Sequence, residues 1–214
     1  KLLAYMIGDG NYLNGNLRFS QINTADTFYE MKKIVESYDC ELKHYDSSNS
    51  PYDYGIVKKH DKYNRTVKNN VKEVLIRYGV YGHGADDKTI PKEIFTAPKH
   101  IVSLFLSRLY GTDGWASVDK PKGRNKYKVE IGYCSNSEEL IRGIAHLLLR
   151  YGIHGFIRKK DKAYVLSIVR KNAILIFAKE INIFGKEAAV KKCVDAVLEK
   201  VSYDDYFPLE VNEK

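Results

Sequence analysis

The pattern of hydrophobic and polar positions predicts that helices and β-hairpins alternate from the first residues onward. A helical pattern over residues 1–7 precedes two strand-like stretches that flank Asn14-Gly15, a dipeptide that strongly favours a tight hairpin turn. We expect the next helix to begin on a Thr or Asn cap. The expected elements of this first part are helices at 1–7, 24–38, 67–78 and 91–95, and strands at 12–13, 17–22, 41–45 and 54–58.

The second part of the chain repeats this order. Residues 106–114 match residues 2–10, since both stretches are apolar helices that end in Asp-Gly. The sequence therefore predicts an α+β fold of two pseudo-symmetric αββαββα half-domains, residues 1–97 and 98–214, each with a saddle-like antiparallel sheet and packed through the two motif helices. The expected elements after the second motif are strands at 115–118, 127–133, 155–159 and 164–169, and helices at 137–151, capped by Ser137, 172–180 and 186–201.

The composition is typical of a soluble globular protein. Hydrophobic residues make up 44% of the 214 residues and charged residues 29%, and no apolar run approaches the roughly 18 residues of a membrane span. Three cysteines without a paired short spacing argue against a disulfide framework and a cysteine-rich zinc site. We expect an intracellular protein, in the cytoplasm or nucleoid. Because the chain begins inside a helical pattern without Met, we also expect it to be cut from something longer.

The charge balance points to a polyanionic partner. Lys and Arg number 35 against 27 Asp and Glu, which gives a formal net charge of +8 and a sequence pI near 9.1. Such an excess favours nucleic acid, although many basic proteins bind none. The net charge alone does not decide whether this protein binds nucleic acid.

The two Asp-Gly motifs form a candidate metal site. A single Gly-Asp-Gly after a helix has a simple structural explanation, in which glycine ends the helix and aspartate shapes the turn. Two copies, each opening the same αββα pattern, favour a shared role. If the two helices pack side by side about a pseudo-twofold axis, Asp9 and Asp113 meet at one end of the interface. Paired carboxylates repel each other, and hard oxygen ligands of this kind select magnesium, which supports in-line phosphodiester hydrolysis.

These residues resemble the two LAGLIDADG motifs of single-chain homing endonucleases, and the resemblance extends over nearly the whole chain. It is similar in arrangement to the endonuclease domains of inteins in replicative DNA helicases. The resemblance implies that Asp9 and Asp113 coordinate two or more Mg²⁺ ions, with the backbone carbonyls of Gly8 and Thr112 adding to the coordination. Both motifs depart from the family's namesake letters at interface positions, while Asp-Gly is intact twice.

Two further segments resemble the lysine-containing blocks of that family. Residues 79–91 contain Lys88, and residues 183–187 contain Lys186. A lysine beside a metal-bound phosphate can polarise the attacking water or neutralise negative charge, so both lysines are candidate catalytic residues. The alternative is that they only begin surface helices. Lys191 is an alternative for the second position, because its distance from the second motif fits the first half better.

Alternate side chains of each sheet are candidates to contact bases in the major groove of double-stranded DNA, and basic loops to contact phosphates. Loop cations of this kind have a second explanation as solvated hairpin tips. The candidate DNA-binding residues are Asn16, Arg18, Ser20 and Gln21 in the first half, and Lys120, Lys122, Arg124, Lys126, Lys128, Glu130, Tyr133, Arg158, Lys159 and Lys160 in the second.

The sequence thus predicts a monomeric, magnesium-dependent endonuclease that needs no protein partner. It would make a staggered double-strand break in a long asymmetric DNA site, because two unlike halves imply unlike half-sites. The resemblance implies 3′ overhangs. The alternative is a binding protein on the same scaffold, either an RNA maturase or a non-cleaving regulator. The target sequence, the half-site orientation and the intein or intron host stay open.

Overall fold

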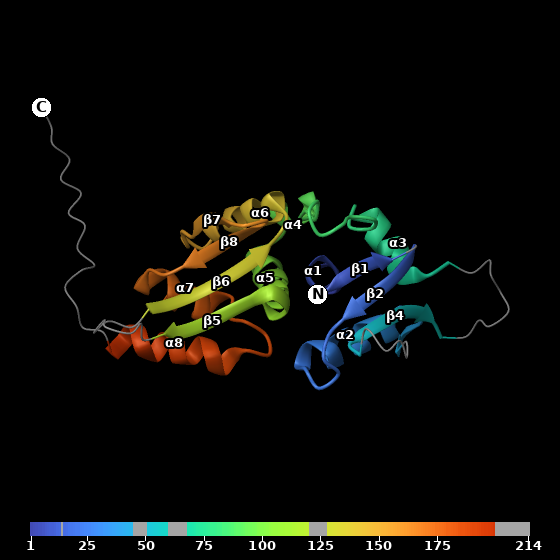
Figure 1. The fold of residues 1–214 in the computed structure, drawn as a ribbon, viewed down its shortest axis with the longest axis horizontal. Helices are drawn as coiled ribbons and strands as arrows, with labels where there is room; N and C mark the ends of the chain where they lie inside the picture. Colours follow the sequence, from blue (N-terminus) through green and yellow to red (C-terminus); the bar gives the residue numbers. More distant parts are fainter. Residues whose placement is uncertain (14, 45–50, 60–67, 120–127, 200–214) are drawn as a thin grey trace, which may run out of the picture.

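The computed structural model describes residues 1–13, 15–44, 51–59, 68–119 and 128–199. It is an α+β structure with two four-stranded antiparallel sheets, as the sequence predicts. The two sheets lie on either side of a central pair of helices, α1 and α5 (Figure 1). No helix in the described ranges is long and apolar enough to cross a membrane.

The first half contains a complete copy of the predicted unit. Its strands pair in the order β1-β2-β4-β3. The hairpin turn between β1 and β2 includes Gly15 at a positive φ of 77°, a backbone conformation that glycine adopts without strain. The elements are α1 Leu2–Gly8, β1 Gly10–Leu13, β2 Asn16–Ser20, α2 Asp26–Ser37, β3 Cys40–His44, β4 Asp53–Lys58, α3 Asn70–Arg77 and α4 Lys92–Thr96.

The second half repeats the order with the sheet β5-β6-β8-β7. Its elements are α5 Lys99–Asp113, β5 Gly114–Asp119, β6 Lys128–Ser135, α6 Glu138–Leu149, β7 Phe156–Lys160, β8 Ala163–Ile168, α7 Lys171–Glu180 and α8 Glu187–Glu199. Strand register relates the two halves residue by residue: Gly10 pairs with Phe19 as Gly114 pairs with Tyr133.

The two helices that follow the first hairpins begin differently. Ser137 caps α6 as predicted, and its Oγ accepts a hydrogen bond of 3.1 Å from the Leu140 backbone N–H. The prediction of a Thr or Asn cap on α2 is wrong. The N-cap there is Ala25, which has no side-chain acceptor, and Asp26 in the first turn supplies the negative charge that the helix dipole favours.

Helices cover one face of each sheet and leave the other face open. Phe19, Ile56, Ile131 and Leu166 belong to the covered faces and are buried in one continuous core with the helices. Because side chains alternate along a strand, their neighbours in sequence lie on the open faces. The motif helices α1 and α5 are themselves part of this core, so both sheets are anchored to the same central pair of helices.

The segment that connects the halves packs against the second half. The Phe95 and His146 rings lie 5.6 Å apart, and Arg150 Nη1 donates hydrogen bonds to the carbonyls of Phe95 and Ala97 at 3.2 and 2.8 Å. Ser137 Oγ donates to the Lys88 carbonyl at 2.6 Å. Residues 88–97, here called the connecting segment, therefore lie along α6. The domain boundary at residues 97 and 98 stays a prediction.

Candidate active site

The two motif helices approach so closely that only small residues fit between them. A methyl group placed on Gly8 would overlap the Thr112 side chain across the interface. Thr112 Oγ1 donates to the Leu109 carbonyl at 2.5 Å, which fixes its rotamer against α5. Asp9 is the C-cap of α1 and Asp113 is the last residue of α5. Close helix packing therefore brings both carboxylates to the same end of the interface.

The two carboxylates interact electrostatically at the motif ends, where Asp9 is partly buried and Asp113 is exposed. Burial and, to a lesser extent, the neighbouring charge of Asp113 raise the pKa of Asp9 to about 7, against the opposing effect of Lys88 and Lys186. Burial also raises the pKa of Asp113 against the same two lysines. An ionised pair in this position is costly without a cation. The fold thus brings Asp9 and Asp113 close enough to interact, and their role as metal ligands stays a prediction.

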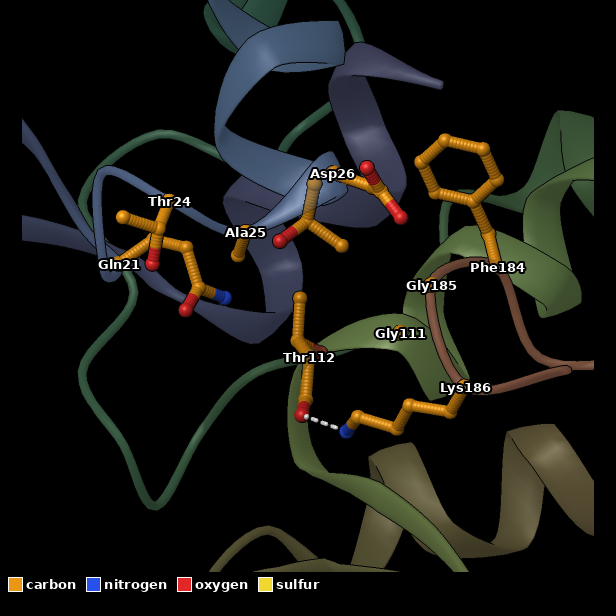
Figure 2. A pocket seen from close by; sticks show the side chains of 10 residues that line it. Gln21, Thr24, Ala25, Asp26, Gly111, Thr112, Phe184, Gly185 and Lys186 are labelled. Atoms are coloured by element: carbon orange, nitrogen blue, oxygen red, sulfur yellow. Dashed lines mark hydrogen bonds between the residues drawn. The ribbon is translucent and has the colours of Figure 1, made fainter. Parts of the chain in front are cut away.

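Each motif end is met by one of the two candidate lysines. Lys88 Nζ donates to the Gly8 carbonyl at 2.5 Å. Lys186 Nζ donates to the carbonyls of Thr112 and Gly114 at 2.8 and 2.6 Å (Figure 2). Burial lowers the pKa of both ammonium groups, and the two aspartates oppose this.

Lys191 occupies a different place. It lies on the exposed surface of α8, where its Nζ pairs with Asp195 at 2.7 Å. Of the two alternatives for the second half, Lys186 is the one beside the motif. Its backbone is positioned by the preceding turn, where Gly185 adopts a positive φ of 78° and the Phe184 N–H donates to the Ser107 carbonyl of α5.

The donor set fits a divalent ion such as Mg²⁺. The carboxylates of Asp9 and Asp113 and the backbone carbonyls of Gly8 and Thr112 are hard oxygen donors. Both carbonyls already accept hydrogen bonds from ammonium groups, which shows that cations can reach them. Within the described residues, no group of three or more His, Cys, Asp and Glu side chains could hold a metal. Magnesium suits this arrangement, because it commonly uses one or two carboxylates and takes its other ligands from water and phosphate.

Gln21 belongs to this site rather than to the sheet surface. It follows β2, and its Nε2 donates to Asp9 Oδ2 at 2.9 Å while its Oε1 accepts from the Ile22 N–H. The register places Ser135 at the equivalent position of the second half, where its Oγ accepts from the Ser137 N–H at 3.1 Å. The site is therefore chemically different on its two sides. Sequence alternation placed Gln21 among base-contacting residues because it could not show where the strand ends.

Two pockets flank the paired aspartates at equivalent positions of the two halves. One has a volume of about 290 Å³ and is lined by Gln21, Thr112 and Lys186 among others (Figure 2). The other has a volume of about 270 Å³ and is lined by Lys88, Asp113 and Ser135 among others. Each pocket opens beside one motif end and one lysine. A substrate group can therefore approach each side of the site separately.

The open faces of the two sheets carry most of the described DNA-binding candidates. Asn16, Arg18 and Ser20 share the open face of the first sheet, and Lys128, Arg158 and Lys160 share that of the second. Lys159 points to the opposite face, where its Nζ lies 5.3 Å from the centre of the Tyr164 ring. Lys120, Lys122, Arg124 and Lys126 lie outside the described residues.

Two predicted base-contacting residues, Tyr133 and Glu130, are too buried to contact bases directly. Tyr133 was predicted to contact bases, but its side chain is fully buried on the covered face of β6. Burial and the charge of Asp113 raise its pKa, yet its hydroxyl has no partner of good hydrogen-bond geometry. Glu130 lies on the open face but is only 3% exposed, because neighbouring side chains cover it. Neither residue reaches a base directly.

Sequence reasoning missed Asp53, a buried carboxylate on the open face of the first sheet. Its Oδ2 pairs with Arg18 Nη1 at 2.5 Å, and its Oδ1 accepts from Ser20 Oγ at 3.3 Å. Asp53 follows a loop rich in Ser, Asn and Pro, so the sequence suggested that this aspartate belongs to a turn rather than to a strand. Only the pairing of Ser20 with Asp53 across the strands places it on this face.

Comparison with known proteins agrees with this geometry. Residues 101–182 match the model of the LAGLIDADG-like domain family. The chain is 27% identical to Protein RecA of Mycobacterium tuberculosis H37Rv over 166 residues, which are 75% of this chain and 19% of that protein. It is 27% identical to the replicative DNA helicase DnaB of Nostoc sp. over 194 residues, 86% of this chain and 22% of that protein. The chain thus spans about a fifth of the length of these relatives.

Solved structures show the same fold. I-DmoI in complex with DNA and Ca aligns with a TM-score of 0.55 and 15% identity, over 89% of this chain and 94% of that one. The LAGLIDADG meganuclease I-AabMI, bound to uncleaved DNA, aligns with a TM-score of 0.55 and 13% identity, over 93% of this chain and 91% of that one. Full-length DUF199/WhiA from Thermotoga maritima aligns with a TM-score of 0.56 and 15% identity, over 95% of this chain and 61% of that one. The chain therefore has the two-domain fold of these LAGLIDADG proteins, and its residues 101–182 match the LAGLIDADG-like domain model.

Proposed function

We propose that this chain is a site-specific DNA endonuclease that hydrolyses one phosphodiester in each strand of a long asymmetric site with Mg²⁺. The observation that carries the proposal is the pair of interacting carboxylates, Asp9 and Asp113, with one lysine at each motif end. A non-cleaving scaffold has no need for two neighbouring carboxylates that repel each other. A divalent cation between them balances their negative charge and can bind a phosphate of DNA at the same time.

The roles of the residues follow from their positions. Asp9 and Asp113 would hold the ions together with the carbonyls of Gly8 and Thr112, and bound Mg²⁺ supplies charge stabilisation and a more acidic water. Lys88 and Lys186 bring positive charge to the place where a phosphate gains negative charge. Gln21 holds Asp9 in a fixed orientation through its amide.

The open sheet faces are the proposed DNA-contacting surfaces. The halves present different side chains there, which supports a non-palindromic target and a monomeric enzyme with two unlike half-sites. We expect a staggered cut with 3′ overhangs from the resemblance to homing endonucleases. The chain is similar to about a fifth of each of two unlike proteins, RecA and DnaB. This supports an inserted element such as an intein. We place the activity inside the cell, where its DNA is.

The deciding experiment is cleavage of a plasmid library with Mg²⁺, with Asp9→Asn and Asp113→Asn as variants. The wild-type chain should give a linear product at one site, and neither variant should give it. Asp195→Asn, which removes an exposed carboxylate from α8, is the matched control and should cut normally. Metal-dependent linear product from either motif variant would refute the proposed roles.

The second candidate is a binding protein without cleavage, either an RNA maturase or a regulator. The observation in its favour is the TM-score of DUF199/WhiA, which equals those of the endonucleases within 0.01. Tight RNA binding without DNA cleavage in the same assay would favour the maturase. Specific DNA binding without cleavage, unchanged by Asp9→Asn, would favour the regulator.

A further inference from the structure

Glu130 is a buried carboxylate on the open face of the second sheet. It lies on the open face of β6 and is 3% exposed. Its Oε1 accepts a hydrogen bond of 2.5 Å from Ser167 Oγ and lies 3.4 Å from Arg158 Nη2. Its Oε2 lies 2.6 Å from Lys128 Nζ. Three side chains from β6, β8 and β7 thus converge on one carboxylate.

The two cations stay accessible above this carboxylate. The side chains of Lys128 and Arg158 are 50% and 55% exposed, so each keeps part of its polar head in solvent while the acid holds the rest. Both side chains lose rotamer entropy when they are held in one conformation. Fixing them before binding lowers the entropy that a partner must otherwise remove.

The first half has a similar arrangement at a position that does not correspond. Asp53, 7% exposed, holds Arg18 and Ser20 on the open face of the first sheet. The register aligns Asp53 with Val165, and it aligns Glu130 with Asn16. An acid with an arginine and a serine therefore occurs in both halves without being inherited from the repeat. Each half has acquired it on the surface proposed to meet DNA.

An acid beneath the two cations orients their side chains but does not increase the attraction of this surface for DNA. Phosphate affinity grows with net positive charge, so a carboxylate on this face weakens it. Discrimination between bases instead requires a donor at a fixed position, as in the pairing of Arg or Lys with guanine O6 and N7. A buried acid that fixes the donor contributes to discrimination without touching DNA.

We propose that Glu130 and Asp53 are positioning residues for sequence specificity, which hold Lys128 with Arg158, and Arg18, as donors to guanine in the two half-sites. This inference rests on the proposed function, since it needs a DNA target. It assigns a role to the acids rather than only to the cations. It also predicts that the two acids act on base pairs on opposite sides of the cleavage centre.

The test uses the full chain and a set of duplexes that vary the recovered target one base pair at a time, with binding measured in Ca²⁺. Glu130→Gln should reduce discrimination at one or two adjacent base pairs about tenfold, while binding to unrelated DNA stays equal or becomes tighter. Asp53→Asn should do the same in the other half-site. Adding Glu130→Gln to a variant with both Lys128→Gln and Arg158→Gln should change little, because the acid acts through these two cations.

Glu138→Gln is the matched control. It also removes a carboxylate from an arginine pair, with Arg142 at 2.6 Å, but on the surface of α6. It should leave every base preference unchanged. Thermal unfolding of each variant separates a folding effect from a positioning effect.

The outcomes distinguish the inference from the proposed function. A wild-type chain that selects no DNA site overturns both. A wild-type chain that selects a site, with Glu130→Gln lowering thermal stability but leaving the base preferences intact, overturns only the inference. A uniform change of affinity across all duplexes with a smaller salt dependence also overturns it, because the cations would then contact phosphates.

Discussion

The raised pKa of Asp9 makes a quantitative prediction about stability. The carboxyl ionises near pH 3.8 when unfolded and near pH 7 in the fold. An acid with a raised pKa destabilises the folded state as pH rises, so the loss begins near pH 4 and is complete above pH 7. The shift of about 3 pKa units corresponds to about 4 kcal/mol at pH 8, and to less than about 1 kcal/mol at pH 4.

Asp9→Asn removes this cost and keeps an oxygen that can accept from Gln21. We therefore expect the variant to raise the free energy of unfolding in EDTA by up to about 4 kcal/mol at pH 8, and by little at pH 4. Urea unfolding followed by circular dichroism at both pH values measures the difference. Added Mg²⁺ should stabilise the wild type and leave the variant nearly unchanged.

Asp195→Asn serves as the control, because its carboxylate is exposed and pairs only with Lys191 across one helical turn in the described part of the chain. It should change stability by less than about 0.5 kcal/mol at either pH. The reasoning fails if Asp9→Asn is no more stable than the wild type at pH 8. It also fails if the gain is the same at both pH values, since burial of the ionised form is then not its cause.

Three further perturbations test the packing around the site. Glu30 accepts two hydrogen bonds of 2.9 Å from Arg108 and one of 2.5 Å from Tyr5, so Glu30→Gln should cost about 3 kcal/mol of stability, with the exposed Glu36→Gln as control; an equal effect of both would contradict this. Gly8→Ala should abolish cleavage and lower the thermal midpoint, because the added methyl overlaps Thr112; a fully active, equally stable variant would show that the helices can separate. Ser137→Ala should cost about 1 kcal/mol through the lost cap of α6 and slow cleavage through the lost contact with the Lys88 carbonyl; a stability loss with unchanged cleavage would remove Lys88 from that explanation.

The order of elements could be predicted from the sequence because each element has a strong local signal. The predicted helix at 172–180 and the observed α7 at Lys171–Glu180 differ by one residue, and Ser137 caps α6 as expected. Local signals are sufficient where period and capping agree. They were insufficient at Ala25, where the helix begins without a side-chain cap.

The contents of the two sheet faces could be predicted only in part. Alternation separates the residues of β6 into two sets, but a shift of one position exchanges the faces. Tyr133 was therefore assigned to the wrong set, and its position opposite Gly114 puts it in the core. Glu130 was assigned to the correct face, but its burial depends on Arg158 and Ser167, which lie on other strands.

Lys88 and Lys186 were found by resemblance to sequence blocks. Gln21 was named from the sequence as a base-contacting residue, and only the structure shows its contact with Asp9. Each lysine reaches a motif carbonyl across a long sequence separation. No periodicity in the sequence encodes such a distance. The Gln21 contact depends on where β2 ends, and the boundary of a strand is the least certain part of a sequence-based assignment.

The connecting segment has a consequence for attempts to recombine halves of related proteins. Residues 88–97 carry Lys88 to the first motif while their backbone is bound by Ser137 and Arg150 of α6. A chimera joined at residue 97 would therefore inherit a lysine from one parent and its support from the other. A functional exchange must transplant this segment together with the α6 surface beneath it, so the natural unit of shuffling crosses the pseudo-twofold axis.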